Sequence, residues 1–190
     1  ELYNEREKYW IKYFKDLKID IKIISGDNPI TVKEVAKDAG VLNYEAFISM
    51  ENVKIEEIKD IVNQYTIFGR TSPDQKQEII KQLQLQGKKV GYVGDGVNDV
   101  TPLRQADCSI ALQNGADSTK AVSDVVLLDN DFSHLPDVFL EGRRVVTNIQ
   151  RSIYLFLTKS FFVAIFSLSS VFMPIGMPLE IESIYNANAI

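Results

Sequence analysis

The sequence predicts an α/β fold, in which a parallel sheet carries helices on both faces and a transmembrane helix follows. Two observations predict this fold class. Over about the first 146 residues, short apolar segments alternate with helix-forming segments, as in parallel sheets covered by helices. Residues 160–179 then form a run of 20 residues without charge. About 20 apolar residues are what a helix needs to span a bilayer.

Composition and charge exclude several classes of protein. Of the 190 residues, 45% are hydrophobic and 25% are charged, which is typical of a folded domain and not of a disordered or collagen-like chain. The formal net charge of −5 argues against a non-specific nucleic-acid binder. The single cysteine, Cys108, and the single histidine, His134, exclude a disulfide framework, a cysteine zinc site and a His-rich metal centre. The first residue is Glu1, not methionine, so we expect the chain to be a piece of a longer protein.

The first predicted strand covers residues 20–25, where the sequence DIKIIS is mostly apolar. A helix is expected at 30–39, and Gly40 is a good terminator for it. Residues 50–61 are charged and helix-prone but carry no chemical signal. We interpret them as a solvated connection.

The second predicted strand, 65–69, leads into a helix over 73–85. Ser72 can cap this helix, and Pro73 suits its first turn because proline has no N–H to leave unpaired. Gly87 follows the last apolar residue and is expected to end the helix.

The remaining elements continue the alternation, which favours parallel strands joined by helical crossovers. We expect strands at 89–93, 108–112 and 125–129, helices at 97–105 and from near His134 with Ser133 as its cap, and a helical turn at 117–122.

Ligands of such folds bind at the carboxyl ends of the strands, and three predicted strands end in polar residues at 25–28, 69–71 and 94–99. The last of these reads Gly-Asp-Gly-Val-Asn-Asp. Its glycines allow a ligand to approach the backbone closely, Asp95 would point into the crevice, and Asp99 would lie near a helix N-terminus. Carboxylate oxygens suit a magnesium ion that also holds a phosphate. The alternative is a common turn in which an aspartate caps a helix.

The other two strand ends supply groups that suit phosphate. Ser25 and the backbone N–H groups after it could cradle phosphate oxygens, while Arg70 and Lys76 could meet their charge. Taken singly, each is about as well explained as a capped loop or a solvated cation. Together with the paired aspartates they indicate a magnesium-dependent phosphoryl-transfer site.

The charges around the apolar run predict its orientation. Arg143, Arg144, Arg151 and Lys159 precede it, whereas Glu180 follows it. By the positive-inside rule the preceding part lies in the cytoplasm. A buried core helix is the alternative, but phenylalanines lie all around the helix and nothing more polar than serine interrupts them.

These segments resemble the C-terminal part of the phosphorylation domain of P-type (E1-E2) cation-transporting ATPases, pumps of the haloacid-dehalogenase superfamily. The resemblance runs from about Ile19 to the end and implies a haloacid-dehalogenase-like Rossmannoid sheet. The segments that carry it are KIISGDNPITV (22–32), FGRTSPDQK (68–76), GYVGDGVND (91–99), LRQADCSIAL (103–112), DVVLLDNDFSHLP (124–136) and EGRRVVTNIQRS (141–152). On this resemblance, residues 1–146 belong to the cytoplasmic phosphorylation domain, 147–159 form a stalk helix, 160–179 the fifth transmembrane helix and 180–190 an extracytoplasmic loop.

The resemblance also implies roles for single residues, with ATP and Mg²⁺ as cofactors. Asp95 resembles the magnesium-ligating aspartate, and Asp99 the second aspartate, which supports the metal site. Lys76 resembles the lysine that contacts the transferred phosphoryl group. The remaining matches are Ser25, Gly26 and Asp27 for a Thr-Gly-Asp motif, in which Ser replaces Thr, and Arg70 and Asn98 for contacts with the nucleotide or phosphate.

Two departures from the family pattern stand out. The family continues its Gly-Asp-Gly-Val-Asn-Asp motif with Ala-Pro-Ala-Leu, whereas residues 100–103 read Val-Thr-Pro-Leu and move the proline by one position. The phosphorylated aspartate of the family lies in an Asp-Lys-Thr-Gly-Thr motif, which this chain lacks, and the string at 117–120 (DSTK) has the wrong order and place. The acceptor is therefore expected upstream of this chain, which should be inactive alone.

The implied function is an ATP-driven cation pump in a membrane, which we expect to be a bacterial plasma membrane. Its partners would be ATP, a cation, the bilayer and the rest of the same polypeptide: the actuator and nucleotide-binding domains and other transmembrane helices. The sequences of these segments are most similar to those of bacterial calcium-pump-like ATPases. However, the start of the expected fifth helix has no carboxylate, and its only ionisable residue is Lys159. Two alternatives stay open: a soluble phosphatase of the same superfamily, and a membrane-anchored nucleotide-binding module without turnover.

Overall fold

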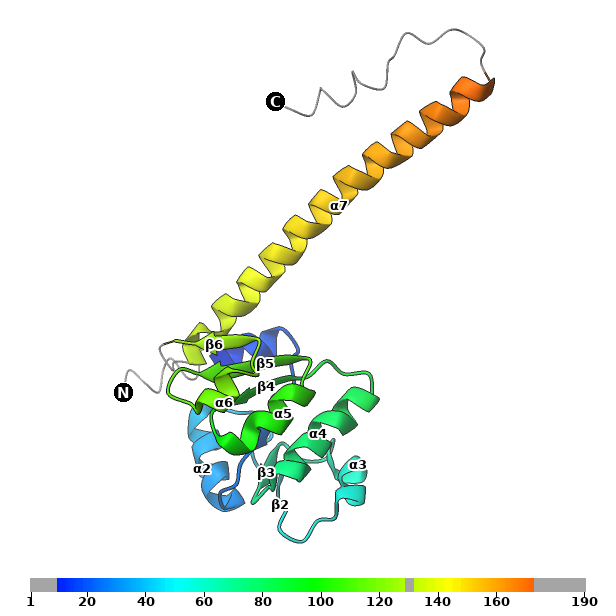
Figure 1. Cartoon of the computed structure of the whole chain (residues 1–190). Helices are drawn as coiled ribbons and strands as arrows, with labels where there is room; N and C mark the ends of the chain where they lie inside the picture. Colours follow the sequence, from blue (N-terminus) through cyan, green and yellow to red (C-terminus); the bar gives the residue numbers. More distant parts are fainter. Residues whose placement is uncertain (1–9, 129–131, 173–190) are drawn as a thin grey trace. The chain divides into compact units, whose positions relative to one another are not determined.

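The computed structural model describes residues 10–128 and 132–172 of the chain (Figure 1). It divides into two compact units, Glu1–Val138 and Phe139–Ile190. The first unit contains the strands and short helices, and the second consists of most of one long helix, so each is described by itself.

The first of two parallel ladders has the strand order β1-β3-β2. β1 (Ile23–Ile24) and β2 (Phe47–Ser49) both pair with the central strand β3 (Ile67–Gly69), with Ile24 and Ile48 opposite Phe68. β1 is shorter than the predicted strand at 20–25, and β2 was not predicted. β2 contains only three residues, which are too few to give a periodic pattern of apolar and polar side chains.

The second ladder has the order β4-β5-β6, also parallel. β4 (Gly91–Gly94), β5 (Cys108–Leu112) and β6 (Val125–Leu127) lie close to the predicted strands, although the predicted end of the last one falls outside the described residues. The alternation predicts one sheet, and here the structure differs: no hydrogen bonds join the two ladders in the described parts of the chain. They are joined by side chains instead, since Ile24 of β1 packs against the core cluster that contains Tyr92 of β4.

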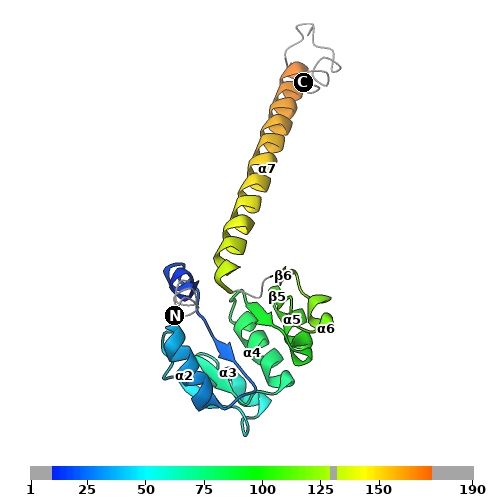
Figure 2. The ribbon, with the colours of Figure 1, turned by 90° about the vertical axis from the view of Figure 1, so that its left-hand side faces the viewer.

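Helices cover both faces of the strands, as predicted. Neighbouring residues of a strand point to opposite faces, so Ile67 of β3 packs on the side of α2 (Pro29–Ala39), whereas Phe68 packs with α4 (Pro73–Leu85). Figure 2 shows α2 and α4 on different sides of the strands. α4 also contacts the second ladder through Ile80, so this one helix packs against both.

The helix ends follow the expected capping chemistry. α4 has the predicted bounds and a capping box, in which Ser72 Oγ accepts from the Gln75 N–H and Gln75 Oε1 accepts from the Ser72 N–H. Gly40 ends α2 in the left-handed region at φ 85°. The predicted helix at 97–105 begins instead as a 3₁₀ turn, η2 (Val97–Asp99), and continues as α5 (Val100–Gln105).

The charged segment 50–61 is not merely a solvated connection, and this interpretation is wrong for its apolar residues. Met50 and Ile58 are fully buried and belong to the core around Phe68. The segment forms a 3₁₀ turn, η1 (Ile55–Glu57), and a short helix, α3 (Ile58–Ile61). The segment has few apolar residues and many charged ones. Its average composition therefore does not reveal that most of the apolar residues face the core.

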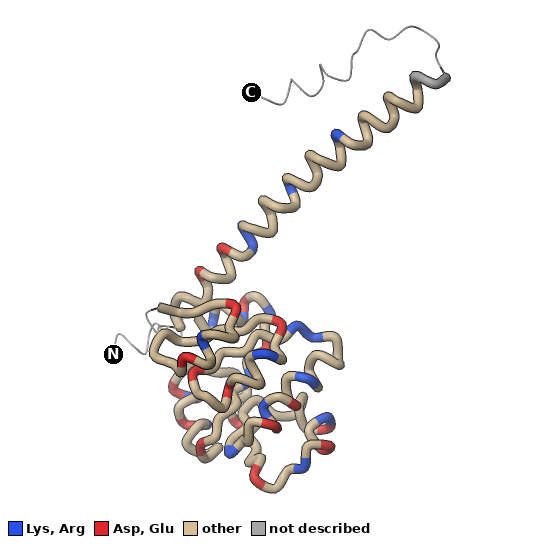
Figure 3. The backbone as a smooth tube through the Cα atoms, viewed as in Figure 1, with Lys and Arg blue, Asp and Glu red and all other residues tan. Residues whose placement is uncertain are grey.

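The second unit consists of α7 (Leu135–Phe172) from Phe139 onward, a helix that follows the 3₁₀ turn η3 (Phe132–His134). Its segment Leu135–Ser169 is long and apolar enough to cross a membrane, and its most apolar window is not buried inside the structure. Charged residues lie toward its beginning (Figure 3), and residues 160–172 carry none. The predicted stalk and the first part of the predicted span thus lie in one helix, whereas residues 173–190, with the expected helix break and loop, lie outside the described residues.

Candidate functional site

Two loops at the carboxyl ends of β1 and β3 are joined by their backbones. The Arg70 N–H donates to Asp27 O at 2.8 Å, and the Thr71 N–H donates to Ser25 O at 3.0 Å. Within the first loop, Ser25 Oγ accepts from the Asp27 N–H at 3.1 Å and donates to Asp27 Oδ2 at 3.3 Å. The structure therefore brings the Ser25-Gly26-Asp27 loop and the Arg70 loop together, as the strand-end argument predicts.

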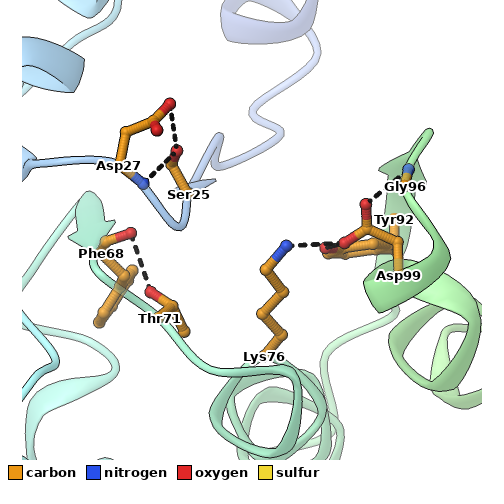
Figure 4. A network of polar contacts seen from close by, with 8 residues as sticks. All are labelled: Ser25, Asp27, Phe68, Thr71, Lys76, Tyr92, Gly96 and Asp99. Carbon is orange, nitrogen blue, oxygen red and sulfur yellow. Dashed lines mark hydrogen bonds and ion pairs between the residues drawn. The ribbon is translucent and has the colours of Figure 1, made fainter.

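Lys76 and Asp99 form a buried ion pair beside these loops (Figure 4). Lys76 Nζ lies 2.7 Å from Asp99 Oδ1, and the two side chains are only 12% and 9% exposed. Lys76 comes from the first turn of α4, and the capping box at Ser72 anchors that turn. Asp99 comes from η2 after β4, so the pair links two strand ends across the site.

Asp99 has two further donors besides Lys76. Tyr92 Oη donates to Asp99 Oδ1 at 2.7 Å, and the Gly96 N–H donates to Asp99 Oδ2 at 3.1 Å. Burial by itself raises the pKa of Asp99, but the hydrogen bonds from Lys76 and Tyr92, with the charge of Lys76, outweigh it and hold this pKa below its ordinary value. Asp99 is therefore an anion whose oxygens are already engaged.

Asp95 differs from Asp99 in its surroundings. Its residue is exposed, and its carboxylate makes no hydrogen bond or ion pair within residues 10–128 and 132–172. Its backbone is anchored, because the Ala116 N–H donates to Asp95 O at 2.8 Å and a Cβ on Gly115 would lie 2.9 Å from that oxygen. Only glycine allows this approach.

The donor set fits a magnesium ion held partly by phosphate. The described residues contain no group of three or more His, Cys, Asp or Glu that could hold a metal ion. Asp95 offers one free carboxylate, and Mg²⁺ is commonly bound through one or two carboxylates, waters and the phosphates of its substrate. Asp99 is committed to Lys76, Tyr92 and Gly96, so it suits a supporting role beside the metal and not direct ligation.

Arg70 and Asn98 lie at the same strand ends but do not join the ion pair. Both are exposed, and Arg70 Nη1 pairs with Glu51 Oε2 at 2.8 Å. Arg70 also adopts φ 51°, a left-handed conformation that is uncommon for residues other than glycine and that recurs at functional sites.

The DSTK string at 117–120 is built as a helical turn, α6 (Asp117–Lys120). Asp117 pairs with Lys120 at 2.8 Å, and the hydroxyl of the fully buried Thr119 donates to Ala116 O. These contacts hold Asp117, Thr119 and Lys120 in local structure, and that the string is no acceptor motif stays a prediction.

Sequence reasoning missed Tyr92 and Glu51 of this region, and it gave no role to Thr71, which it placed only among the polar residues at 69–71. Tyr92 could have been found from strand alternation, since it lies two residues before Gly94 and so points to the same face. Thr71 is buried and its hydroxyl donates to Phe68 O at 3.1 Å. Glu51 gives no signal, because only the fold brings it beside Arg70.

Comparison with known proteins gives one family and several relatives. Residues 2–107, more than half of the chain, match the family of haloacid dehalogenase-like hydrolases. The probable cation-transporting ATPase exp7 of Streptococcus pneumoniae is 39% identical over 166 residues, which are 86% of this chain and 21% of the relative. The calcium-transporting ATPase CtpE of Mycobacterium bovis is 41% identical over 158 residues, 83% of this chain and 20% of the relative. The chain thus spans about a fifth of the length of these relatives.

Solved structures agree with this. The catalytic domain of the CPx-ATPase CopB-B, described for its conformational changes upon nucleotide binding, is 32% identical with a TM-score of 0.54, covering 70% of this chain and 43% of that one. The resemblance to cation-transporting ATPases and the predicted fold class are confirmed by these matches.

Proposed function

The chain belongs to the haloacid dehalogenase-like hydrolase family, and we propose that it is part of the phosphorylation domain of an ATP-driven cation pump, with the membrane helix that follows it. The observation that carries the proposal is the buried pair of Lys76 and Asp99, which holds an ammonium group at the carboxyl ends of the strands. The similarity to two cation-transporting ATPases supports it.

The proposed reaction has two steps. A carboxylate oxygen of an aspartate outside this chain bonds to the γ-phosphorus of ATP, the bond from that phosphorus to the β,γ-bridging oxygen breaks, and ADP leaves. Water then attacks the phosphorus of the aspartyl phosphate and loses a proton, and inorganic phosphate leaves as the carboxylate is regenerated.

Lys76 stabilises the transferred group in both steps. An ammonium group has three donors, and in this structure one is directed at Asp99 Oδ1. The other two are free to bind phosphoryl oxygens, whose negative charge they offset from a side chain that is only 12% exposed. Asp99 keeps the ammonium group in place and uses only one of its three donors.

Asp95 would hold the magnesium ion. When bound, the ion would neutralise phosphate charge and bridge the phosphate to the protein. The anchored backbone of Asp95 keeps its carboxylate at the strand end, where the substrate phosphate would lie. The loop of Ser25, Gly26 and Asp27 would donate hydrogen bonds from its hydroxyl and N–H groups to phosphate oxygens, in place of the present contacts between Ser25 Oγ and Asp27.

Arg70 and Asn98 would contact the nucleotide or its phosphates. Both are exposed at the same edge, and the guanidinium of Arg70 is held toward that edge by Glu51. An exposed ion pair contributes little to stability, so a phosphate can exchange with Glu51 at small cost.

The membrane part of the proposal rests on α7. We propose that it crosses a bacterial plasma membrane with the strands on the cytoplasmic side, and that the intact pump includes further domains and transmembrane helices of the same polypeptide. Calcium is the proposed transported ion, because the relative CtpE is named a calcium-transporting ATPase.

The test uses the full-length protein in membranes, incubated with radiolabelled ATP and Mg²⁺ across a panel of cations. We expect a protein-bound label that hydroxylamine removes and that depends on Ca²⁺. Asp95→Asn should reduce the label at least about 100-fold, since it removes the metal ligand.

Asp117→Asn is the matched control, because Asp117 is an exposed aspartate near the same edge that pairs only with Lys120 among the described residues. It should label like the wild type. Absence of hydroxylamine-sensitive label under every cation would overturn the pump assignment, and normal labelling of Asp95→Asn would overturn the metal assignment.

A further inference from the structure

Tyr92 is a buried tyrosine whose hydroxyl reaches the centre of the proposed site (Figure 4). It is 8% exposed, and Tyr92 Oη donates to Asp99 Oδ1 at 2.7 Å. The same oxygen accepts from Lys76 Nζ at 2.7 Å. One carboxylate oxygen thus holds two side-chain donors, one neutral and one cationic.

The ring of Tyr92 is fixed by its surroundings. It packs in a core cluster with Ile80 of α4 and Leu103 of α5. On the same face of β4, Gly94 leaves the space that Asp99 occupies: a Cβ there would lie 2.6 Å from Asp99 Cβ and 3.0 Å from Tyr92 Cε1. Tyr92 of β4 and Asp99 of η2 therefore pack closely against each other, so the Tyr92 hydroxyl contacts the Asp99 carboxylate in one orientation.

The direction of the hydrogen bond is determined by the charges. Asp99 is ionised and can only accept. Burial, together with the hydrogen bond to Asp99, raises the pKa of Tyr92 well above its ordinary value, so the hydroxyl keeps its proton and donates it.

We propose that Tyr92 is a positioning residue for phosphoryl transfer, acting through Asp99 on Lys76. Its hydroxyl occupies one lone pair of Oδ1 and so limits the ammonium to the other, while the Gly96 N–H holds Oδ2. With both oxygens fixed, the carboxylate cannot rotate, and Lys76 presents its two remaining donors in a constant direction. Catalysis depends on such pre-set geometry. This inference rests on the proposed function of the same site.

The test is Tyr92→Phe in the full-length protein, which keeps the packed ring and removes only the hydroxyl. We expect the rate of phosphoenzyme formation at saturating ATP to fall about 10-fold, the usual effect of losing a hydrogen bond to a charged group. The KM for ATP should stay within about twofold, because Tyr92 does not touch the nucleotide-binding residues. A purely structural role would lower the amount of active protein and leave the rate per active site unchanged.

Tyr65→Phe is the matched control. Tyr65 is half-buried and packs against the core around Phe68. It lies just before the amino end of β3, whereas the site lies at the carboxyl end. Its hydroxyl makes no hydrogen bond in the described chain. This variant should phosphorylate at the wild-type rate.

A double-mutant cycle with Lys76→Arg tests whether Tyr92 acts through Lys76. Residues that act as a unit are not additive, so Tyr92→Phe should reduce the rate of the Lys76→Arg protein by less than about twofold. An equal 10-fold loss in both backgrounds, or an unchanged rate of Tyr92→Phe alone, would overturn the inference. If the wild type forms no phosphoenzyme, the proposed function fails instead, so the two failures are distinguishable.

Discussion

At the scale of single residues, the site depends on how two aspartates of one motif differ. Asp95 is exposed with an unoccupied carboxylate, whereas Asp99 is 6% exposed and surrounded by donors. Burial of a carboxylate is unfavourable unless donors compensate it. The three donors to Asp99 reverse that cost, and the two residues can therefore have separate roles in metal binding and in positioning Lys76.

The lowered pKa of Asp99 predicts a pH dependence of stability. Because the folded-state pKa lies below its ordinary value of 3.8, ionised Asp99 stabilises the folded chain above that value, and the contribution is lost as the pH falls through the folded-state pKa. Asp99→Asn leaves Lys76 buried without its partner, so we expect a loss of about 3 kcal/mol in the free energy of unfolding near pH 7. The loss should shrink as the pH falls below 3.8 and through the lower folded-state pKa of Asp99, because the wild type then loses its own ion pair.

Urea unfolding of residues 1–138, the part that we expect to fold without detergent, between about pH 3 and pH 7 measures this difference. Asp60→Asn is the control, since Asp60 is exposed on α3 and its carboxylate has no partner among the residues that the structure describes. A destabilisation by Asp99→Asn that did not vary with pH would contradict the assignment.

At the scale of elements, α4 organises the first unit. It carries Lys76, packs against both ladders, and holds the charged segment 50–61 through Gln75. Gln75 is 8% exposed, and its Nε2 donates to Met50 O at 2.9 Å and to Val53 O at 2.8 Å. One side chain thus satisfies two backbone carbonyls and also closes the capping box.

We predict that Gln75→Ala destabilises the chain by about 2 kcal/mol, because buried carbonyls lose their donor and the capping box opens. The measurement is the urea midpoint at an unchanged m-value. Gln77→Ala, two positions further along α4, should change stability by less than about 0.5 kcal/mol, since the Gln77 side chain makes no hydrogen bond in the described chain. Equal effects of both variants would show that Gln75 does not link the segment to α4.

At the scale of the whole molecule, the two units differ in how much of their apolar side-chain surface is buried. The core of the first unit is closed by residues up to Leu135, which is 5% exposed. α7 leaves large apolar side chains uncovered within the described residues, among them Phe156, Phe161 and Leu168. A soluble protein rarely exposes a continuous apolar surface of this kind.

We predict that residues 1–138 fold as a detergent-free monomer, whereas the 190-residue chain requires detergent. Gel filtration and sedimentation of both chains, with and without detergent, measure this. The cut after Val138 keeps Leu135 in its core, so loss of folding is not expected. A monomeric 190-residue chain in plain buffer would favour the alternative of a soluble phosphatase.

The sequence determined the elements wherever one local signal dominates. α4 begins and ends as its cap and apolar spacing predict, and β5 has the predicted bounds, because runs of apolar residues and capping chemistry act over a few neighbouring residues. The motif residues around Asp27, Lys76 and Asp99 were selected from polar types at predicted strand ends and from the resemblance to a known family, and their roles stay predictions. The apolar part of α7 could be predicted because its signal is simply length without charge.

Only the tertiary structure decided which of these residues meet and what else joins them. The separation into two ladders, the burial of Met50 and Ile58, and the contact of Glu51 with Arg70 depend on segments far apart in the sequence. The sharing of Asp99 Oδ1 by Lys76 and Tyr92 likewise needs α4, β4 and η2 in place together. Local pattern specifies elements because its interactions are short in sequence, whereas a shared hydrogen-bond acceptor is a property of packing and exists only in the folded chain.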